Sequence, residues 1–198
     1  MLAYVFWHTP LANVAHHDYE TALVHFHADL GRSPPAGVKS SATYRVSGLP
    51  WLNRQPCYED WCFITSSAVL EPLNRAAVAP ERWDAHAGVA SKTDFGHGGL
   101  YYHLHGDQRT AGTRVVWLKR PRGIRYEKPL QDMIDRSTGF VSCWRKLMVL
   151  GPGHEFAIVG GSALEVPLLD GWEALVVNRR LLGPEPSSVG ADLHAKVG

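Results

Sequence analysis

Residues Tyr58 to Leu73 read YEDWCFITSSAVLEPL, and a stretch built on the same pattern, HEFAIVGGSALEVPL, occupies His154 to Leu168. The positions that agree in register are Trp61 with Phe156, Ser67-Ala68-Val69 with Ser162-Ala163-Leu164, and Pro72-Leu73 with Pro167-Leu168. An internal repeat of this kind indicates a duplicated chain. The sequence therefore predicts two halves, residues 1–106 and a shortened second copy at 113–182, followed by a loose tail at 183–198.

Each half is predicted to follow the element order β-α-β-β-α-β. Runs of β-branched and aromatic residues predict the strands, and an apolar stripe that follows the N-cap residue Asp18 predicts the first helix. The first half is expected to contain strands at 2–8, 38–46, 58–65 and 100–105, a helix at 18–30, and a second helical stretch from 66 that breaks at Ala79-Pro80 and restarts over 81–90. The second half is expected to contain strands at 115–119, 144–150, 156–159 and 172–178, a helix opening at Tyr126, and a helix of about two turns at 162–169.

This element order predicts an α+β fold made of two ferredoxin-like repeats, each an antiparallel sheet with helices on one face. The bare face of each sheet needs a cover, and the other half supplies it, so we expect the sheets to pack as a single-chain pseudo-dimer. The plan resembles the dimeric α/β-barrel superfamily, with both partners fused in one chain up to about Leu182. The segments YEDWCFITSSAVLEPLNRAAV and LMVLGPGHEF are also similar to bacterial proteins of uncharacterised function.

The composition limits the kinds of molecule that we expect the protein to bind. The 198 residues include 20 Lys plus Arg and 19 Asp plus Glu, for a formal charge of +1, with no basic stripe that would neutralise phosphates. The apolar run at the N-terminus is interrupted by His8 and Pro10, and is too short for a signal peptide or a membrane span. The three cysteines form no C-x-x-C pair. We therefore expect a cytoplasmic protein that binds neither nucleic acid nor membrane.

One edge of the first predicted sheet gathers polar side chains. In a ferredoxin-like sheet the first strand lies between the third and fourth strands, so its end meets the start of both and the end of the second strand. That edge is expected to bring together His8, Glu59 or Asp60, Arg45, Tyr101 and the turn that carries His97. A histidine beside a carboxylate is suited to general base catalysis near neutral pH. His8 would then be the base, Asp60 its orienting carboxylate, and Arg45 or Tyr101 the group that polarises a ligand oxygen. The alternative is that polar residues gather at strand ends because those ends meet water.

Further residues are candidates for ligand binding. Trp7, Tyr44 and Trp61 lie on strands whose free face would line a barrel cavity. His27 occupies a helix position that corresponds to Ile134 in the second half, at the margin of the core, where it would face a pocket or be hydrogen-bonded in place. His97 lies in the glycine-rich stretch 95–99, which we expect to be a turn.

The spacing of the histidines is compatible with a bound cofactor, although we expect the protein to bind none. His103 and His105 project from one face of the predicted fourth strand and could supply two ligands to a divalent metal, with further ligands from elsewhere. His27 could serve as an axial ligand to haem, a cofactor that several relatives in the resembled superfamily use.

Three functions remain open from the sequence. The first is a small-molecule binder or enzyme that holds an apolar or aromatic ligand in the first half, and the resemblance implies monooxygenase- or isomerase-like chemistry. The second is a haem or metal protein that uses the histidines. The third is a non-catalytic assembly subunit whose sheet pairs with another chain, and the sequence leaves homo-oligomerisation open as well.

Overall fold

The computed structural model describes residues 1–52, 56–108, 112–148 and 151–184. Its strands form one closed antiparallel barrel in the order β1-β3-β2-β8-β5-β7-β6-β4. The strands are β1 (Leu2–Pro10), β2 (Val38–Val46), β3 (Cys57–Ile64), β4 (Thr93–Gly106), β5 (Arg114–Lys119), β6 (Thr138–Lys146), β7 (Phe156–Glu165) and β8 (Glu173–Leu181). The α-helices are α1 (His16–Arg32), α2 (Leu70–Ala77), α3 (Trp83–Ala90) and α4 (Glu127–Asp135), and short 3₁₀ turns, Ser67–Val69 and Pro80–Arg82, lead into α2 and α3.

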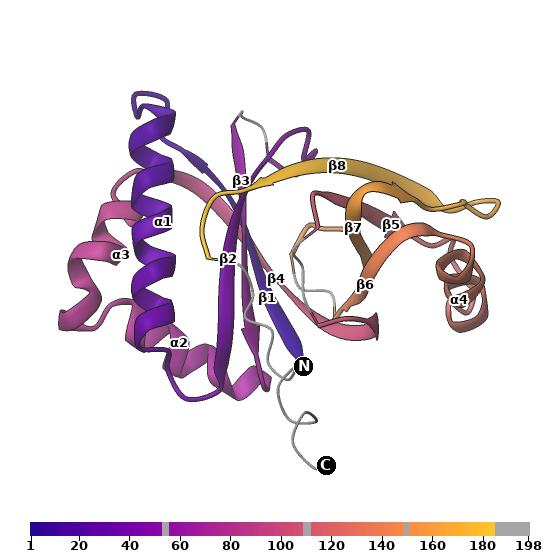
Figure 1. The fold of residues 1–198 in the computed structure, drawn as a ribbon, viewed down its shortest axis with the longest axis horizontal. Helices are drawn as coiled ribbons and strands as arrows, with labels where there is room; N and C mark the ends of the chain where they lie inside the picture. The colour runs from indigo at the N-terminus through magenta and orange to yellow at the C-terminus, as the bar shows by residue number, and fades with distance from the viewer. Residues whose placement is uncertain (53–55, 109–111, 149–150, 185–198) are drawn as a thin grey trace, which may run out of the picture.

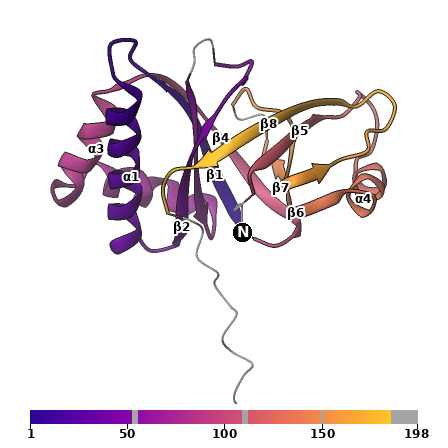
Figure 2. The ribbon, with the colours of Figure 1, turned by 45° about the horizontal axis from the view of Figure 1, so that its top comes forward.

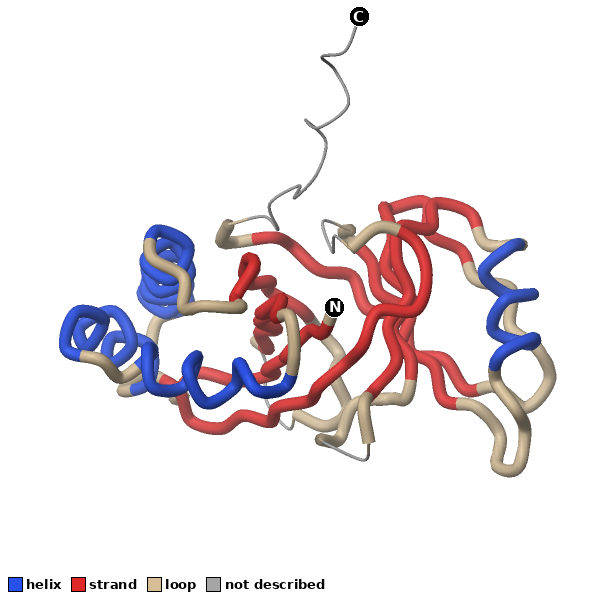
Figure 3. The backbone as a smooth tube through the Cα atoms, turned by 90° about the horizontal axis from the view of Figure 1, so that it is seen from below, coloured by secondary structure: helices blue, strands red, loops and turns tan. Residues whose placement is uncertain are grey.

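The helices lie outside the barrel, on two opposite sides. Figures 1 and 3 show α1, α2 and α3 together on one side and α4 alone on the other, with the strands between them. Helix α4 packs its buried Leu130 and Met133 into a hydrophobic cluster with Leu118 and Ile158. In the described part of the chain, no helix combines the length and the apolar character needed to cross a membrane.

Strand alternation places the core inside the barrel. On β1, Ala3, Val5 and Trp7 are fully buried and belong to one hydrophobic cluster, whereas the residues between them face outward. The same inner cluster contains Trp61, Tyr101, Trp117 and Trp144, one aromatic ring from each of four further strands. The ring centroids of Trp7 and Trp117 are 5.5 Å apart, in an edge-to-face arrangement that aromatic pairs favour.

The predicted pair of ferredoxin-like repeats, with two open sheets packed face to face, is wrong. The strands close into one barrel because β2 pairs with β8 and β4 pairs with β6. Figure 2 shows β8 arching across from the second half to reach β2. Strand β4 is much longer than the predicted strand at 100–105, and it pairs with β1 along one part and with β6 along another. Closure satisfies the backbone groups that free sheet edges would leave unpaired.

The predicted tandem repeat and the resemblance to the dimeric α/β-barrel superfamily are also wrong. The stretch 162–169 was expected to be a helix, as its counterpart is, but Ser162 to Glu165 continue strand β7. The hydroxyl of Thr138 donates to the carbonyl of Ala163 at 2.9 Å, and a guanidinium N–H of Arg114 donates to the carbonyl of Leu164 at 3.1 Å. These bonds hold the segment extended, so the described second half lacks the second helix. The boundaries 1–106 and 113–182 stay a prediction, and of the predicted tail 183–198, residues 185–198 lie outside the described residues.

A buried ion pair ties the two halves together inside the barrel. Glu59 on β3 has no solvent exposure, and its carboxylate accepts hydrogen bonds from the indole N–H groups of Trp7 at 2.9 Å and Trp61 at 2.7 Å. The guanidinium of Arg179 on β8 donates to the same carboxylate at 3.1 Å and to the carbonyl of Gly112 at 2.8 Å. The charged carbon of Arg179 also lies 4.0 Å from the centre of the Tyr44 ring.

Removing one charge of this pair should strongly destabilise the fold. In Glu59→Gln the guanidinium of Arg179 stays buried without a counter-charge, and we expect a loss of about 3–5 kcal/mol in the free energy of unfolding. Urea unfolding followed by circular dichroism measures it. The double variant Glu59→Gln, Arg179→Met should regain much of the loss, and Glu71→Gln, which breaks the exposed pair Glu71–Arg75, should have no measurable effect. A wild-type midpoint for Glu59→Gln would contradict the role given to this pair.

Candidate functional site

Two histidines from different elements converge on one carboxylate outside the barrel. Because Glu59 points inward on β3, Asp60 points outward, toward helix α1. The Nε2 atom of His8, on β1, lies 3.2 Å from Asp60 Oδ2, and the Nε2 atom of His27, on α1, lies 3.3 Å from the same oxygen. His8 is 1% exposed, His27 0% and Asp60 9%. The structure thus brings together the predicted pair His8 and Asp60 and adds His27 to it.

Hydrogen bonds at the far side of each imidazole fix the two rings. His8 Nδ1 lies 2.6 Å from the hydroxyl of Tyr19, and that hydroxyl lies 2.8 Å from Thr93 Oγ1. His27 Nδ1 lies 2.9 Å from Ser41 Oγ. The Nε2 atoms of both rings are therefore the ones that face the carboxylate.

Buried polar atoms without hydrogen-bond partners gather around Asp60. They are the Nε2 atoms of His8 and His27, Asp60 Oδ1, and the hydroxyl of Thr43, which pairs with Asp60 across β2 and β3. Both imidazoles approach Oδ2 closely enough for an ion pair but at an oblique angle, so their contacts are not hydrogen bonds. Nearly all buried polar atoms of native proteins are paired. A group of unpaired atoms in one place therefore marks a position where a ligand or water supplies the partners.

The protonation state of the carboxylate follows from its surroundings. Burial pushes the pKa of Asp60 upward, but the charges and N–H groups of His8 and His27 act in the opposite direction and win. The net result is a pKa well below the ordinary 3.8, so Asp60 is ionised at neutral pH. Burial, with the nearby charge of Asp60, raises the pKa of the Cys62 thiol to about 12, and this thiol stays protonated.

Asp60 and His27 line a cavity of about 670 Å³ between the outer face of the sheet and helices α1, α2 and α3. Its other lining residues are mostly apolar, with Leu70 and Leu73 on α2 and Val89 on α3 among them. His27 also borders a smaller cavity of about 70 Å³, next to Ser41. The large cavity has the size of a small-molecule site, and its polar groups are few.

Glycines on β4 shape the floor of this cavity. A Cβ atom on Gly98 would lie 2.7 Å from the Tyr4 hydroxyl, and one on Gly96 would collide with the ring of Phe6. The two rings on β1 therefore lie across a strand that has no side chains at these positions. The predicted turn at 95–99 is wrong, because these residues belong to β4. Their glycines leave room for aromatic rings and do not form a loop.

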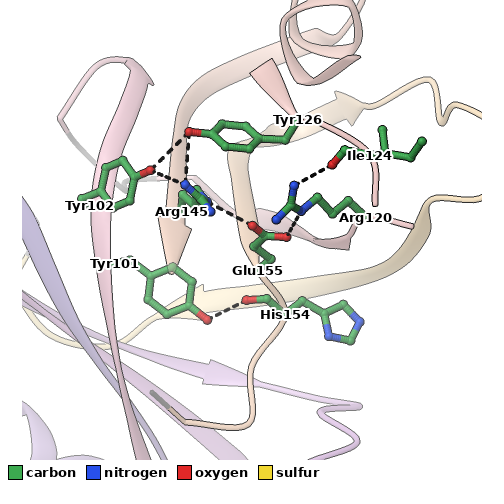
Figure 4. Close-up of polar contacts among 8 residues, drawn as sticks. All are labelled: Tyr101, Tyr102, Arg120, Ile124, Tyr126, Arg145, His154 and Glu155. Carbon is green, nitrogen blue, oxygen red and sulfur yellow. Dashed lines mark hydrogen bonds and ion pairs between the residues drawn. The ribbon is translucent and has the colours of Figure 1, made fainter. Parts of the chain in front are cut away.

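The barrel wall separates the remaining predicted site residues from this cluster. Trp7, Tyr44, Trp61 and Tyr101 belong to the inner cluster, on the opposite face of the sheet. The Tyr101 hydroxyl donates to the carbonyl of His154 at 2.9 Å, as Figure 4 shows. The predicted roles of these residues beside His8 therefore find no geometric support.

Arg45 and His97 are also placed elsewhere. Arg45 faces outward, but its guanidinium forms an ion pair with Glu20 on α1 at 3.2 Å. His97 pairs with Trp7 across β4 and β1, and its ring packs edge-on against Phe95, with centroids 4.4 Å apart. Neither residue contributes a recorded contact to Asp60.

The predicted metal pair His103 and His105 is split by an irregularity in β4. His103 pairs with Trp144 and His105 with Cys143, so two residues of β4 advance against one of β6. Within residues 1–52, 56–108, 112–148 and 151–184, no group of three or more His, Cys, Asp or Glu has the geometry of a metal site. The haem alternative stays a prediction, although both ring nitrogens of His27 face protein groups.

The second half carries a polar network of a different kind. Glu155 accepts hydrogen bonds from Arg145 at 3.0 Å and from Arg120 at 2.8 Å, and Arg145 also donates to the hydroxyls of Tyr102 at 2.9 Å and Tyr126 at 3.2 Å (Figure 4). Both oxygens of this carboxylate have partners within the chain. This network is therefore structural, whereas the Oδ1 atom of Asp60 has no hydrogen-bond partner.

Comparisons with known proteins do not assign this chain to a family. No family model matches the chain, and the curated proteins contain no match. Among solved structures, an anthrone oxidase-like protein has a TM-score of 0.45 at 10% identity, over 90% of this chain and 72% of that chain. The protein At3g17210 from Arabidopsis thaliana has a TM-score of 0.43 at 10% identity, over 53% of this chain and 97% of that chain. Both TM-scores are too low for either likeness to assign a function.

Sequence reasoning missed Tyr19, Ser41, Thr43 and Thr93. A signal for two of them was present, because Ser41, Thr43 and Arg45 alternate along one predicted strand and must share a face. The helix that carries His27 was expected on that face. Tyr19 and Thr93 carried no such signal, since their meeting depends on where α1 and the start of β4 lie in space.

The lowered pKa of Asp60 predicts a pH dependence of stability. Its native pKa lies below that of an unfolded aspartate, about 3.9, so the unfolded chain binds more protons in the window just below about pH 5. The stabilisation from this carboxylate is complete above about pH 5 and is lost as the pH falls. The difference in unfolding free energy between wild type and Asp60→Asn should therefore shrink between about pH 5 and pH 3 in urea titrations. Parallel pH curves for the two proteins would be inconsistent with this account.

A side chain at Gly96 should push the Phe6 ring into the cavity. We expect Gly96→Ala to lower the free energy of unfolding by about 1–3 kcal/mol, the usual cost of overpacking. Gly88→Ala is the matched control, because a Cβ atom there meets nothing within 4 Å. It lies within α3, so it should be neutral or stabilising by up to about 1 kcal/mol. Equal stability of the two variants in urea unfolding would show that Gly96 is not needed for packing.

Proposed function

We propose that this chain binds an apolar small molecule in the cavity between the barrel and helices α1 to α3, and transfers a proton at the polar end of that ligand. The observation that carries the proposal is the cluster of unpaired buried atoms around Asp60, which together with His27 lines a cavity of about 670 Å³. Apolar walls provide affinity through burial, and a small number of polar groups fix the orientation.

Two imidazoles beside a carboxylate are suited to accept and donate protons near neutral pH. Asp60 borders the cavity and is ionised, so its carboxylate is suited to accept a hydrogen bond from the ligand. His8 and His27 contact one oxygen of that carboxylate, and their imidazoles are the groups that would carry the proton. This assignment differs from the sequence-based one, because Asp60 borders the cavity while His8 does not.

Isomerase-like chemistry fits this arrangement better than the alternatives. A proton shift within one ligand needs an acid and a base side by side, and the cluster offers both without a cofactor. A non-catalytic assembly subunit needs no ligand cavity, whereas the outer face of this sheet borders one. No contact in the described chain favours the monooxygenase alternative.

The cavity can be tested with a neutral fluorescent probe, N-phenyl-1-naphthylamine, whose emission rises in apolar surroundings. We expect saturable binding to the wild-type protein. Ala77→Phe on α2 adds a ring inside the cavity and should weaken binding at least about ten-fold, because the ligand and the ring compete for the same volume. Fluorescence titration measures both.

The matched control is Glu71→Phe, which adds the same ring to the exposed side of α2. It should bind the probe as wild type does. Absence of saturable binding to wild type, or equal weakening by the two variants, would overturn the assignment of the ligand to this cavity.

A further inference from the structure

The proposed proton transfer needs a group that holds an oxygen atom of the ligand. A proton leaves carbon readily where an adjacent carbonyl takes up the electron pair, and a donor to the carbonyl oxygen stabilises the charge that develops there. The sequence suggested Arg45 or Tyr101 for this role. Arg45 is paired with Glu20, and Tyr101 belongs to the inner cluster, where it donates to the carbonyl of His154. The role therefore falls to another donor that lines the cavity.

Some of the polar side chains around the cavity already have partners. The two ring nitrogens of His27 face Ser41 and Asp60. The hydroxyl of Thr93 donates to the carbonyl of Val89 at 3.0 Å. The donors that remain in the described lining of the cavity are Tyr4 on β1, Asn74 on α2 and His86 on α3.

Tyr4 is the donor that the sheet holds in place. Asn74 is exposed on its helix, and the ring of His86 packs against Phe26 on the helical side of the cavity, with centroids 6.0 Å apart. Tyr4 instead shares the outer face of the sheet with Asp60, because Tyr4 pairs with Cys62 across β1 and β3. A donor on a strand is more precisely positioned than one on a short helix.

The hydroxyl of Tyr4 is available to a ligand. Among the described residues it has no hydrogen-bond partner, and it is not one of the unpaired atoms that are sealed from solvent. Burial raises the pKa of Tyr4, and the neighbouring Cys62 and Asp60 add to the rise, so the hydroxyl keeps its proton at neutral pH. A protonated tyrosine hydroxyl donates one hydrogen bond.

The hydroxyl of Tyr4 and the carboxylate of Asp60 lie on opposite sides of Phe6. Phe6 pairs with Asp60 on β3 and with Gly98 on β4. The Tyr4 hydroxyl lies over Gly98, where a Cβ atom would approach it to 2.7 Å. Because neighbouring strands are about 4.8 Å apart, the hydroxyl lies about 10 Å from the backbone of Asp60. Tyr4, Phe6 and Asp60 all line the cavity, so one ligand can contact all three.

We propose that Tyr4 donates a hydrogen bond to a carbonyl oxygen of the ligand, which lies across Phe6 with its reactive carbon toward Asp60. The inference rests on the proposed function and adds a ligand class, an apolar carbonyl compound. In the reaction a C–H bond next to the carbonyl breaks, its electron pair forms a C=C bond, and the carbonyl electrons move to the oxygen held by Tyr4. The proton passes to the cluster of His8, His27 and Asp60 and returns to a different atom of the same ligand.

Displacement of bound N-phenyl-1-naphthylamine by 2-acetonaphthone tests the contact. The matched ligand is 2-isopropenylnaphthalene, in which a CH₂ group replaces the carbonyl oxygen. Tyr4→Phe removes only the hydroxyl. We expect this variant to weaken binding of the ketone about three- to ten-fold, the usual worth of one hydrogen bond, and to change binding of the hydrocarbon by less than about two-fold. In infrared spectra, the carbonyl stretching frequency of the bound ketone should be lower with wild type than with Tyr4→Phe.

Tyr126→Phe is the matched control, because it removes a tyrosine hydroxyl on the α4 side of the barrel, and it should bind both ligands as wild type does. His86→Leu tests the competing donor and should leave the preference for the ketone unchanged.

Equal effects of Tyr4→Phe on the two ligands overturn the role of Tyr4 while the cavity assignment stands, and so does loss of the ketone preference in His86→Leu alone. If Tyr4→Phe does not fold, the wild-type spectrum decides, because a bound carbonyl frequency equal to that of the ketone in hexane excludes the hydrogen bond. Failure of the probe to bind wild type overturns the cavity assignment and this inference with it.

Discussion

The carboxylate of Glu59, held inside the barrel by Trp7, Trp61 and Arg179, is the constraint on which the rest of the structure depends. A buried carboxylate must keep its partners, so β3 cannot slip by one residue without moving Glu59 to the outside and Asp60 to the inside. The ion pair that joins the two halves therefore also sets the face on which Asp60 emerges. Barrel closure and the polar cluster are two consequences of one strand register.

The two faces of the same sheet are used differently. Inside, large aromatic side chains from several strands pack against one another, and the charged groups there are fully paired. Outside, the glycines of β4 leave room at the floor of the cavity, and the short helices α2 and α3 form the opposite wall of that cavity. The other side of the barrel contrasts with this, because α4 packs its apolar residues directly onto Leu118 and Ile158. The cavity therefore lies only on the side covered by α1, α2 and α3, and it depends on the residues beneath those helices. The barrel alone would not produce it.

Much of the local structure could be predicted from the sequence, because it depends on neighbours in the chain. The strand at 38–46 was predicted with its observed bounds, and the proximity of His8 and Asp60 followed from the expected position of the first strand between its two neighbours, which the pairing of β1 with β3 and β4 confirms. Barrel closure could not be predicted, since it depends on pairing between residues far apart, such as Tyr44 with Leu181. Likewise the strand at Ser162 is set by Thr138 and Arg114, whose contacts override a local pattern that favours a helix.

The two buried carboxylates, adjacent in sequence, show why one is structural and the other is a candidate for function. Glu59 is surrounded by donors, so its burial is compensated in full. Asp60 is held by two imidazoles at oblique angles, and its second oxygen has no partner, which costs on the order of 1–3 kcal/mol for each unpaired group. His8 and His27 offset part of that cost, because they hold the pKa of Asp60 below its ordinary value. The carboxylate of Asp60 therefore keeps hydrogen-bonding capacity that Glu59 has already used, and this difference makes Asp60 the candidate for function.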